Sequence, residues 1–556
     1  MKIKIISPVS VLIVMLAALS GCQDIDLLPK DNLSDPQFWK TPSDFQKAAN
    51  YLYSRMESFN TDDNESDIAF GGGANSVSSG TYIAPNAESG YWNDRFADLR
   101  GCNQIIEKAE TYAGDMAGIE VYAAEARFFR AYTLWRLMKR YNDVQLITKT
   151  LNVESPELYG ERTPQATVED FILSELEAIW QKLPLEKNVA AADKGRITQG
   201  AALALKARVA LFAGTWAKYH GHREDYAQLL NQAIVAAETV RTGGEYSIWG
   251  EMGDESYRYM FIEQGDDNSE SILANRYVTD IRTHGISHQA YWGDRSSPTK
   301  KMADMYLCKS TGLPITAPGS GFAGYDRMAD EYTNRDPRMT QTFLMPGTTF
   351  LNAQDAALVN SPLFNSRPNT KTGYKLWKFI GEARTVNNQT TYDCHIIRYA
   401  EVLLILAEAT FEKDGAISDE VLNNTINVIR SRKGVEMPPL TNVFVTENGL
   451  NMQTEIRRER TVELAFEGFR RDDLKRWKTA ETELVQAIKG FKYTGTEYEE
   501  EGVLSDSEAT KVDENGFYVV EPAENRKFVA PKNYYNSLPL DETKLNPKLL
   551  PNNPGW

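Results

Sequence analysis

Basic side chains are scarce in this sequence of 556 residues, which has 61 lysines and arginines against 77 aspartates and glutamates and a formal net charge of −16. Binding along a nucleic-acid backbone needs clustered basic residues, so this composition argues against a nucleic-acid partner. Long apolar runs are also missing after the first 22 residues. The longest candidate, 399–409, contains Glu401 and Glu408 and is shorter than the ~20 residues of a membrane-spanning helix. No G-x-S-x-G nucleophile motif occurs.

Cysteine is rare as well, with four residues at positions 22, 102, 308 and 394. If Cys22 carries a lipid, as argued below, an odd number without close spacing remains, which does not support a disulfide framework. We expect Cys102, Cys308 and Cys394 to be small buried side chains. Hydrophobic residues make up 42% of the chain and charged residues 25%, which are values of a globular protein.

The first 22 residues have the features of a bacterial lipoprotein signal. Lys2 and Lys4 precede an apolar run at 9–19, and the run ends in Leu-Ser-Gly-Cys at 19–22, which is similar to a lipobox. We therefore expect a signal peptide at 1–21 and a lipid anchor on the thiol of Cys22. The alternative is an ordinary buried cysteine after a signal peptide.

Apolar residues recur near a 3.6-residue period in two parts of the chain. The expected helices cover 44–59, 91–111, 119–141, 167–183, 199–213, 226–240, 398–411, 418–433 and 454–477. Their lengths and small-residue faces predict a mainly α fold, a tetratricopeptide-like scaffold of antiparallel helix pairs, although no repeat consensus is visible. Residues 243–390 lack this period, because Gly, Pro, Asn and Thr interrupt short apolar runs, and predict an irregular α+β insert.

The chain is accordingly expected to have four parts. They are the signal peptide 1–21, an N-terminal helical scaffold 22–242, the insert 243–390 as the candidate ligand-binding region, and C-terminal helices with an extended tail at 391–556. The scaffold contains a long loop rich in Gly, Ser, Asn and Asp at 60–92, called the early loop below. Loops of this length in a compact protein are usually functional or disordered.

Acidic and basic residues alternate in the helix expected at 454–477. The spacing predicts surface ion pairs along that helix, namely Glu455 with Arg458, Glu463 with Arg460, and Glu467 with Arg470 and Arg471. Such pairs contribute a few tenths of a kcal/mol each. We interpret them as a packing device, with a catalytic Arg/Glu cluster as the weaker alternative.

Five blocks together resemble the SusD/RagB family of nutrient-binding outer-membrane lipoproteins. They are AEARFFRAY at 124–132, GRITQGAALALKARVALFAG at 195–214, RYAEVLLILAEA at 398–409, EIRRERTVELAFEGFRRDDLKRW at 455–477 and NPKLLPNNPGW at 546–556. With the lipobox, the resemblance runs from Cys22 to Trp556. It implies a protein on the cell surface, anchored in the outer membrane, that captures a glycan or oligosaccharide and delivers it to a SusC-like TonB-dependent transporter. It implies no enzyme activity, cofactor or metal.

Two other functions stay open: a surface glycan hydrolase, whose carboxylate pair is defined only in space, and a RagB-like peptide-binding protein. Two local motifs are weaker still. His284 and His288 have the spacing of metal ligands but lack the glutamate of H-E-x-x-H, and the G-x-G-x-x-G at 319–324 follows prolines rather than a strand.

Aromatic rings beside polar groups are the signal for a sugar site, because sugars present both C–H faces and hydroxyl groups. The resemblance implies a site where the early loop faces the insert. The candidate ligand-binding residues are Asn60, Asp67, Tyr82, Tyr91, Trp92, Tyr291, Trp292 and Arg295. Each ring could instead belong to the framework, Trp92 above all, since it can open a core helix.

Overall fold

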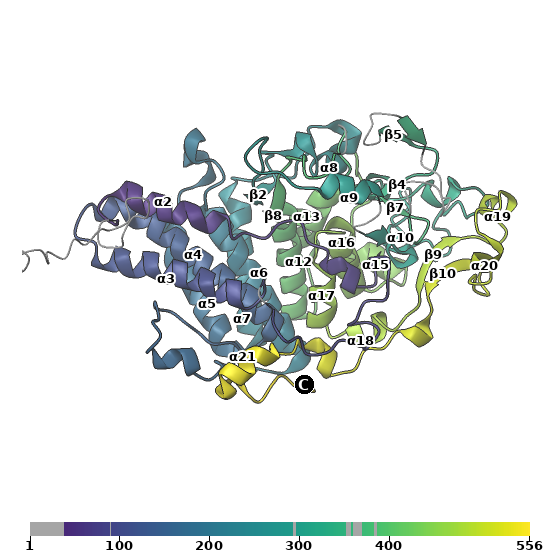
Figure 1. The fold of residues 1–556 in the computed structure, drawn as a ribbon. Helices are drawn as coiled ribbons and strands as arrows, with labels where there is room; N and C mark the ends of the chain where they lie inside the picture. Colours follow the sequence, from purple (N-terminus) through teal and green to yellow (C-terminus); the bar gives the residue numbers. More distant parts are fainter. Residues whose placement is uncertain (1–37, 89, 293–295, 352–356, 360–369, 383–385) are drawn as a thin grey trace, which may run out of the picture.

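A computed structural model describes residues 38–88, 90–292, 296–351, 357–359, 370–382 and 386–556. Helices dominate it, and the strands are short (Figure 1). The N-terminal helices are α2 (Pro42–Tyr53), α3 (Asn93–Thr111), α4 (Met116–Tyr141), α5 (Gln165–Ile179), α6 (Gln199–His220) and α7 (Tyr226–Gly243). The insert contains α8 (Ser256–Tyr259), α9 (Ile286–Trp292), α10 (Lys300–Met305) and α11 (Arg338–Thr342). The remaining helices are α12 (Tyr399–Asp414), α13 (Asp419–Asn424), α14 (Ile426–Arg430), α15 (Asn442–Glu447), α16 (Met452–Glu463), α17 (Arg470–Arg476), α18 (Ala480–Glu483), α19 (Glu497–Glu500), α20 (Asp506–Ala509) and α21 (Leu540–Leu545).

The scaffold is an array in which each long helix packs on the next. α3 packs on α4, α4 on α5, α5 on α6 and α6 on α7, and then α12 packs on α7 although the insert lies between them in the sequence. α6 approaches α7 closely, since a Cβ on Gly214 would lie 2.8 Å from Cγ of Leu230. The array confirms the predicted tetratricopeptide-like scaffold, with its helices on the left and in the centre of Figure 1.

Two expected helices are interrupted. Residues 418–433 form α13 and α14 rather than one helix, and the helix expected at 454–477 ends at Glu463 and restarts at Arg470. Phe466 has a φ of 64° and Gly468 a φ of 88°, values that an α-helix cannot contain. The block that resembled one long helix is therefore two helices joined by a turn.

The insert has its own apolar core, built from buried rings and aliphatic side chains such as Tyr257, Tyr306 and Phe343. Among the described residues, ten short strands pair antiparallel in five two-stranded sheets. The pairs are β1 (Ala69–Phe70) with β3 (Ser297–Pro298), β2 (Ser271–Asn275) with β8 (Cys394–Arg398), β4 (Phe343–Leu344) with β7 (Lys375–Leu376), β5 (Thr349–Leu351) with β6 (Ala357–Val359), and β9 (Ile488–Lys492) with β10 (Phe517–Glu521). This mixture confirms the irregular α+β character expected of the insert.

A buried ionic junction joins the insert to α16. Glu463 accepts hydrogen bonds from Arg398 at 2.7 Å, Arg432 at 2.7 Å and Arg338 at 2.9 Å. Burial by itself would raise the pKa of the Glu463 carboxyl, but the three guanidinium groups hold it well below its usual value. Glu467 likewise binds Arg398 at 2.8 Å and Lys378 at 2.7 Å.

The junction corrects the predicted surface pairs. Only Glu455 keeps its expected partner, Arg458, at 3.2 Å. For Glu467 the turn at 464–469 removes the helical spacing that the prediction needed. Glu463 and Arg460 do share α16, but Arg460 binds Asp473 at 2.8 Å, and Glu463 binds arginines of other elements.

Two further features follow from the described residues. Cys102, Cys308 and Cys394 are all buried, as expected. None of the helices in the described part of the chain combines the length and the apolar character that crossing a bilayer requires.

Candidate ligand-binding site

The early loop meets the insert through a short strand pair. In β1 and β3, Ala69 lies opposite Pro298 and Phe70 opposite Ser297. The hydroxyl of Thr299 donates to the backbone oxygen of Asp67 at 2.7 Å, which extends the contact. The two segments selected for ligand contact from the sequence are therefore neighbours at this point.

An open groove of about 550 Å³ lies beside this junction. Its volume is within the range of about 300–1,000 Å³ of small-molecule sites. The groove is lined by Phe70, Gly72, Gly73, Ala74, Thr370, Lys371, Glu508, Tyr518, Val520, Glu521, Pro522 and Asn525. Four separate parts of the chain thus contribute to one surface: the early loop, the segment before β7, α20, and β10 with the residues that follow it.

Glycine shapes the near wall of the groove. Gly72 has a φ of 92°, a conformation that side-chain-bearing residues rarely adopt, and a Cβ on Gly73 would meet no atom within 4 Å. The backbone of the early loop is therefore accessible to a ligand. Such a wall offers N–H and C=O groups to hydroxyl groups, while Phe70 supplies apolar surface.

The two carboxylates of the groove are already engaged by neighbouring residues. Glu508 accepts from the hydroxyl of Ser505 at 2.6 Å, a bond that lowers the pKa of its carboxyl. Glu521 is buried and binds Arg526 at 2.6 Å. Lys371 is exposed at the rim. The polar groups of the groove therefore suit hydrogen bonding to a ligand better than proton transfer.

A second open cleft, of about 780 Å³, lies on the insert away from the early loop. Its floor contains Arg258, whose guanidinium carbon lies 3.7 Å from the ring centre of Trp377. Arg258 also binds Glu382 at 2.6 Å. This cleft contains no residue predicted from the sequence.

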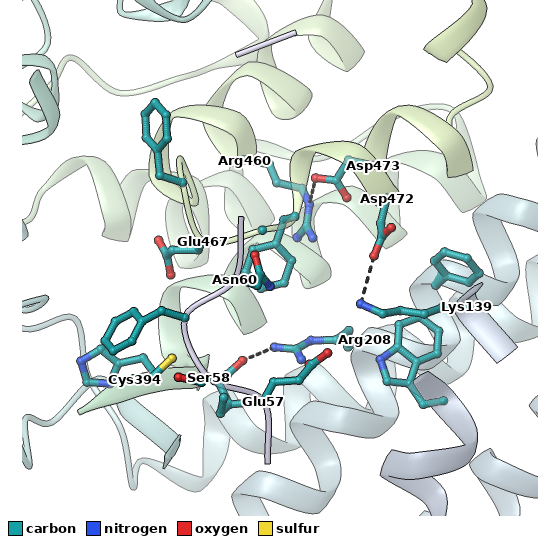
Figure 2. A pocket seen from close by; sticks show the side chains of 18 of the residues that line it. Glu57, Ser58, Asn60, Lys139, Arg208, Cys394, Arg460, Glu467, Asp472 and Asp473 are labelled. Carbon is teal, nitrogen blue, oxygen red and sulfur yellow. Dashed lines mark hydrogen bonds and ion pairs between the residues drawn. The ribbon is translucent and has the colours of Figure 1, made fainter. Parts of the chain in front are cut away.

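A small pocket of about 90 Å³ lies where the scaffold, the insert and the start of the early loop meet. Figure 2 shows side chains of α4, α6, α16 and α17 around it, with Lys139 bonded to Asp472 at 3.2 Å and Arg460 to Asp473 at 2.8 Å. This volume is below the range of about 300–1,000 Å³ of small-molecule sites. Asn60 lines this pocket and is half-buried.

Three of the predicted ligand residues are buried in the framework. Asp67 is 4% exposed and forms a bidentate pair with Arg470, with both bonds at 2.8 Å. Trp92 is 4% exposed and packs edge-on against Tyr141. Tyr291 is 2% exposed and belongs to the core of the insert. The structure places these side chains among protein atoms rather than at the groove.

The other predicted residues fall in different places. The ring of Tyr82 packs on Trp556 with centroids 5.1 Å apart, and Arg140 lies 3.7 Å from the ring centre of Tyr91. Tyr82 therefore contacts the C-terminal tail and Tyr91 the end of α4. The tail lies at the bottom of Figure 1, whereas α9 lies near the top. Trp292 ends α9, is half-buried and contacts the ring of Tyr291.

Arg295 and Cys22 lie outside the described residues. The sequence analysis did not select Phe70, Lys371 or Tyr518, which line the groove. The glycine run at 71–73 was the only signal for this groove in the sequence, because Lys371 and Tyr518 come to it from distant parts of the chain.

Comparison with family models finds a match to the SusD family over residues 260–556, more than half of the chain. SusD-like protein P2 of Formosa agariphila is 25% identical over 567 residues, covering 98% of each protein.

Two crystal structures from Bacteroides fragilis have the same fold. One is a SusD-like carbohydrate-binding protein that is 25% identical, with a TM-score of 0.75 over 92% of this chain and 100% of that one. The other is a SusD-like protein that is 23% identical, with a TM-score of 0.73 over 95% of this chain and 100% of that one.

Proposed function

This chain belongs to the SusD family, and from that membership we propose that it is a cell-surface lipoprotein that binds an oligosaccharide and delivers it to a SusC-like TonB-dependent transporter. The observation that carries the binding part is the groove where the early loop meets the insert, in a chain related to a carbohydrate-binding protein. The lipid anchor would be on Cys22, and the four parts of the chain would be those expected from the sequence.

Capture without turnover fits the chemistry of the groove. A glycoside hydrolase needs one carboxyl group with a raised pKa to act as an acid and a second as base or nucleophile. In the groove, Glu508 is held by Ser505, with a lowered pKa, and Glu521 is paired with Arg526. These contacts favour a binding protein over an enzyme.

The proposed ligand contacts combine the groove with the end of α9. Phe70 and Trp292 would supply apolar faces, and Lys371 with the backbone of Gly72 and Gly73 would supply hydrogen-bond donors and acceptors. One stacked ring contributes about 1–2 kcal/mol and one net hydrogen bond about 0.5–1.5 kcal/mol. After the cost of association, a few such contacts leave a micromolar to millimolar affinity, which suits release to a transporter.

Calorimetry on the mature protein tests this proposal with a panel of oligosaccharides and a panel of peptides, and reducing-end analysis of the same mixtures tests for turnover. We expect saturable binding of one oligosaccharide class without new reducing ends. Trp292→Ala and Lys371→Ala should each weaken it about fivefold or more. Tyr159→Ala is the matched control, because Tyr159 is an exposed aromatic residue outside the groove. Peptide binding alone, or release of reducing ends, would refute the proposal.

A further inference from the structure

Four carboxylates precede the glycine run of the early loop within six positions: Asp62, Asp63, Glu65 and Asp67. In an open loop they would repel one another. The structure instead places them against α17 and the turn before it. There, arginine side chains and backbone N–H groups bind the four carboxylates, which offsets their mutual repulsion.

Two arginines of α17 hold three of the four carboxylates. Arg470 binds Asp67 with two parallel bonds of 2.8 Å, and both side chains are buried. Arg471 donates to Asp62 at 2.8 Å and to Glu65 at 3.1 Å. Bidentate arginine–carboxylate pairs are both stronger and more directional than single ones.

The fourth carboxylate binds the backbone. Asp63 accepts from the N–H of Gly468 at 2.9 Å and from the N–H of Arg470 at 3.0 Å, and it is buried. A Cβ on Gly468 would lie 2.0 Å from the amide oxygen of Asn60, so the turn and the loop are in close contact. Side-chain and backbone contacts thus hold residues 60–67 against α17 and the turn before it.

The other side of the same segment is attached to the insert. Asn64 accepts from the hydroxyl of Ser296 at 2.6 Å, and Thr299 donates its N–H to the oxygen of Ile68 at 3.0 Å. The glycine run that lines the groove follows directly after this doubly held segment. Its position therefore depends on contacts made several residues earlier.

We propose that Asp62, Asp63, Glu65 and Asp67, together with Arg470 and Arg471, form a loop clamp that presents the glycine wall of the groove to the ligand. The proposal rests on the proposed function and makes Arg470 and Arg471 positioning residues, since neither lines the groove. A loop held in its bound conformation binds more tightly, because the ligand does not have to order it.

The test compares Arg471→Gln and Asp67→Asn with the control Arg458→Gln, which removes an arginine ion pair to Glu455 elsewhere. Hydrogen–deuterium exchange of residues 66–75 reports the order of the loop without any ligand. We expect at least fivefold faster exchange there in the two clamp variants and about fivefold to tenfold weaker binding of the oligosaccharide that the wild type binds. Asp67→Asn should also lower the melting temperature, because it leaves the buried Arg470 without this carboxylate. Arg471→Gln should keep a melting temperature close to that of the control, because its partners Asp62 and Glu65 are partly exposed. Arg471→Lys should recover part of the affinity.

The outcomes separate the two proposals. Unchanged exchange in both clamp variants refutes the clamp, whatever the ligand. Faster exchange with wild-type affinity refutes its role in positioning. If the wild-type protein binds no oligosaccharide, the proposed function is refuted, and so is the role of the clamp in presenting the groove to a ligand. The exchange data would still show whether the clamp orders the loop.

Discussion

Glu463→Gln is the most direct test of the buried ionic junction. Glu463 is fully buried and accepts hydrogen bonds from Arg398, Arg432 and Arg338 at 2.7–2.9 Å. Glutamine has the same shape but no charge, so the variant leaves three buried guanidinium groups with one carboxylate fewer. Among the described residues, Arg432 would then keep Glu270, at 2.6 Å, as its carboxylate partner.

The expected cost is large because removing one partner of a buried ion pair typically destabilises a protein by about 3–5 kcal/mol. A surface pair gives the contrast. Glu238 and Arg241 lie three residues apart on α7 at 2.6 Å, with side chains 42% and 25% exposed. We expect Glu238→Gln to cost less than about 1 kcal/mol, because water screens such pairs.

Urea unfolding, followed by tryptophan fluorescence and circular dichroism, compares the two variants with the wild type. The insert and the scaffold should separate at a lower urea concentration in Glu463→Gln, because the junction joins them. If Glu463→Gln and Glu238→Gln lie within about 1 kcal/mol of each other, the junction contributes no more than a surface pair and the reasoning is wrong.

Three further predictions concern other parts of the molecule. Burial lowers the pKa of His220 to about 4, and its Nε2 bonds to the backbone oxygen of Lys475. The unfolded chain therefore takes up the proton first, and the stability of the folded protein falls as the pH drops from about 6.5 to 4. His220→Gln should flatten that part of a plot of melting temperature against pH, and an unchanged slope would contradict this reasoning. Gly468→Ala should destabilise the protein by about 1–3 kcal/mol in urea unfolding, because φ is 88° and a Cβ would collide with Asn60; wild-type stability would show that the turn can relax. Cys22→Ala should lose the outer-membrane fraction on cell fractionation, and full retention without the transporter would exclude a lipid anchor there.

Local patterns predicted the scaffold well. The helix expected at 119–141 is α4 (Met116–Tyr141), and the one expected at 226–240 is α7 (Tyr226–Gly243). A helix depends on contacts between residues three and four apart, so its periodicity is visible in a single sequence. The break at 464–469 was not predicted, because it depends on a backbone turn that the apolar and charged pattern does not reveal.

Which residues bind the ligand stays a prediction, and the structure shows where the selected residues lie. The sequence analysis selected the early loop and the region of α9, and β1 with β3 brings the loop to the insert. It did not distinguish a ring on the surface from a ring in a core, and Trp92 and Tyr291 are both buried. Side-chain chemistry is the same in both places, and only the surrounding atoms differ.

The sequence by itself determined the helical scaffold, the irregular insert and the family, because these depend on local periodicity and on contiguous blocks of residues. The tertiary structure alone decided the partners of the charged residues and the walls of the groove. Asp67 and Arg470 are 403 positions apart and 2.8 Å from each other, and no spacing rule along a helix connects them. Electrostatic attraction and burial act through space, so residues that the chain separates widely become neighbours only after the scaffold and the insert have packed together.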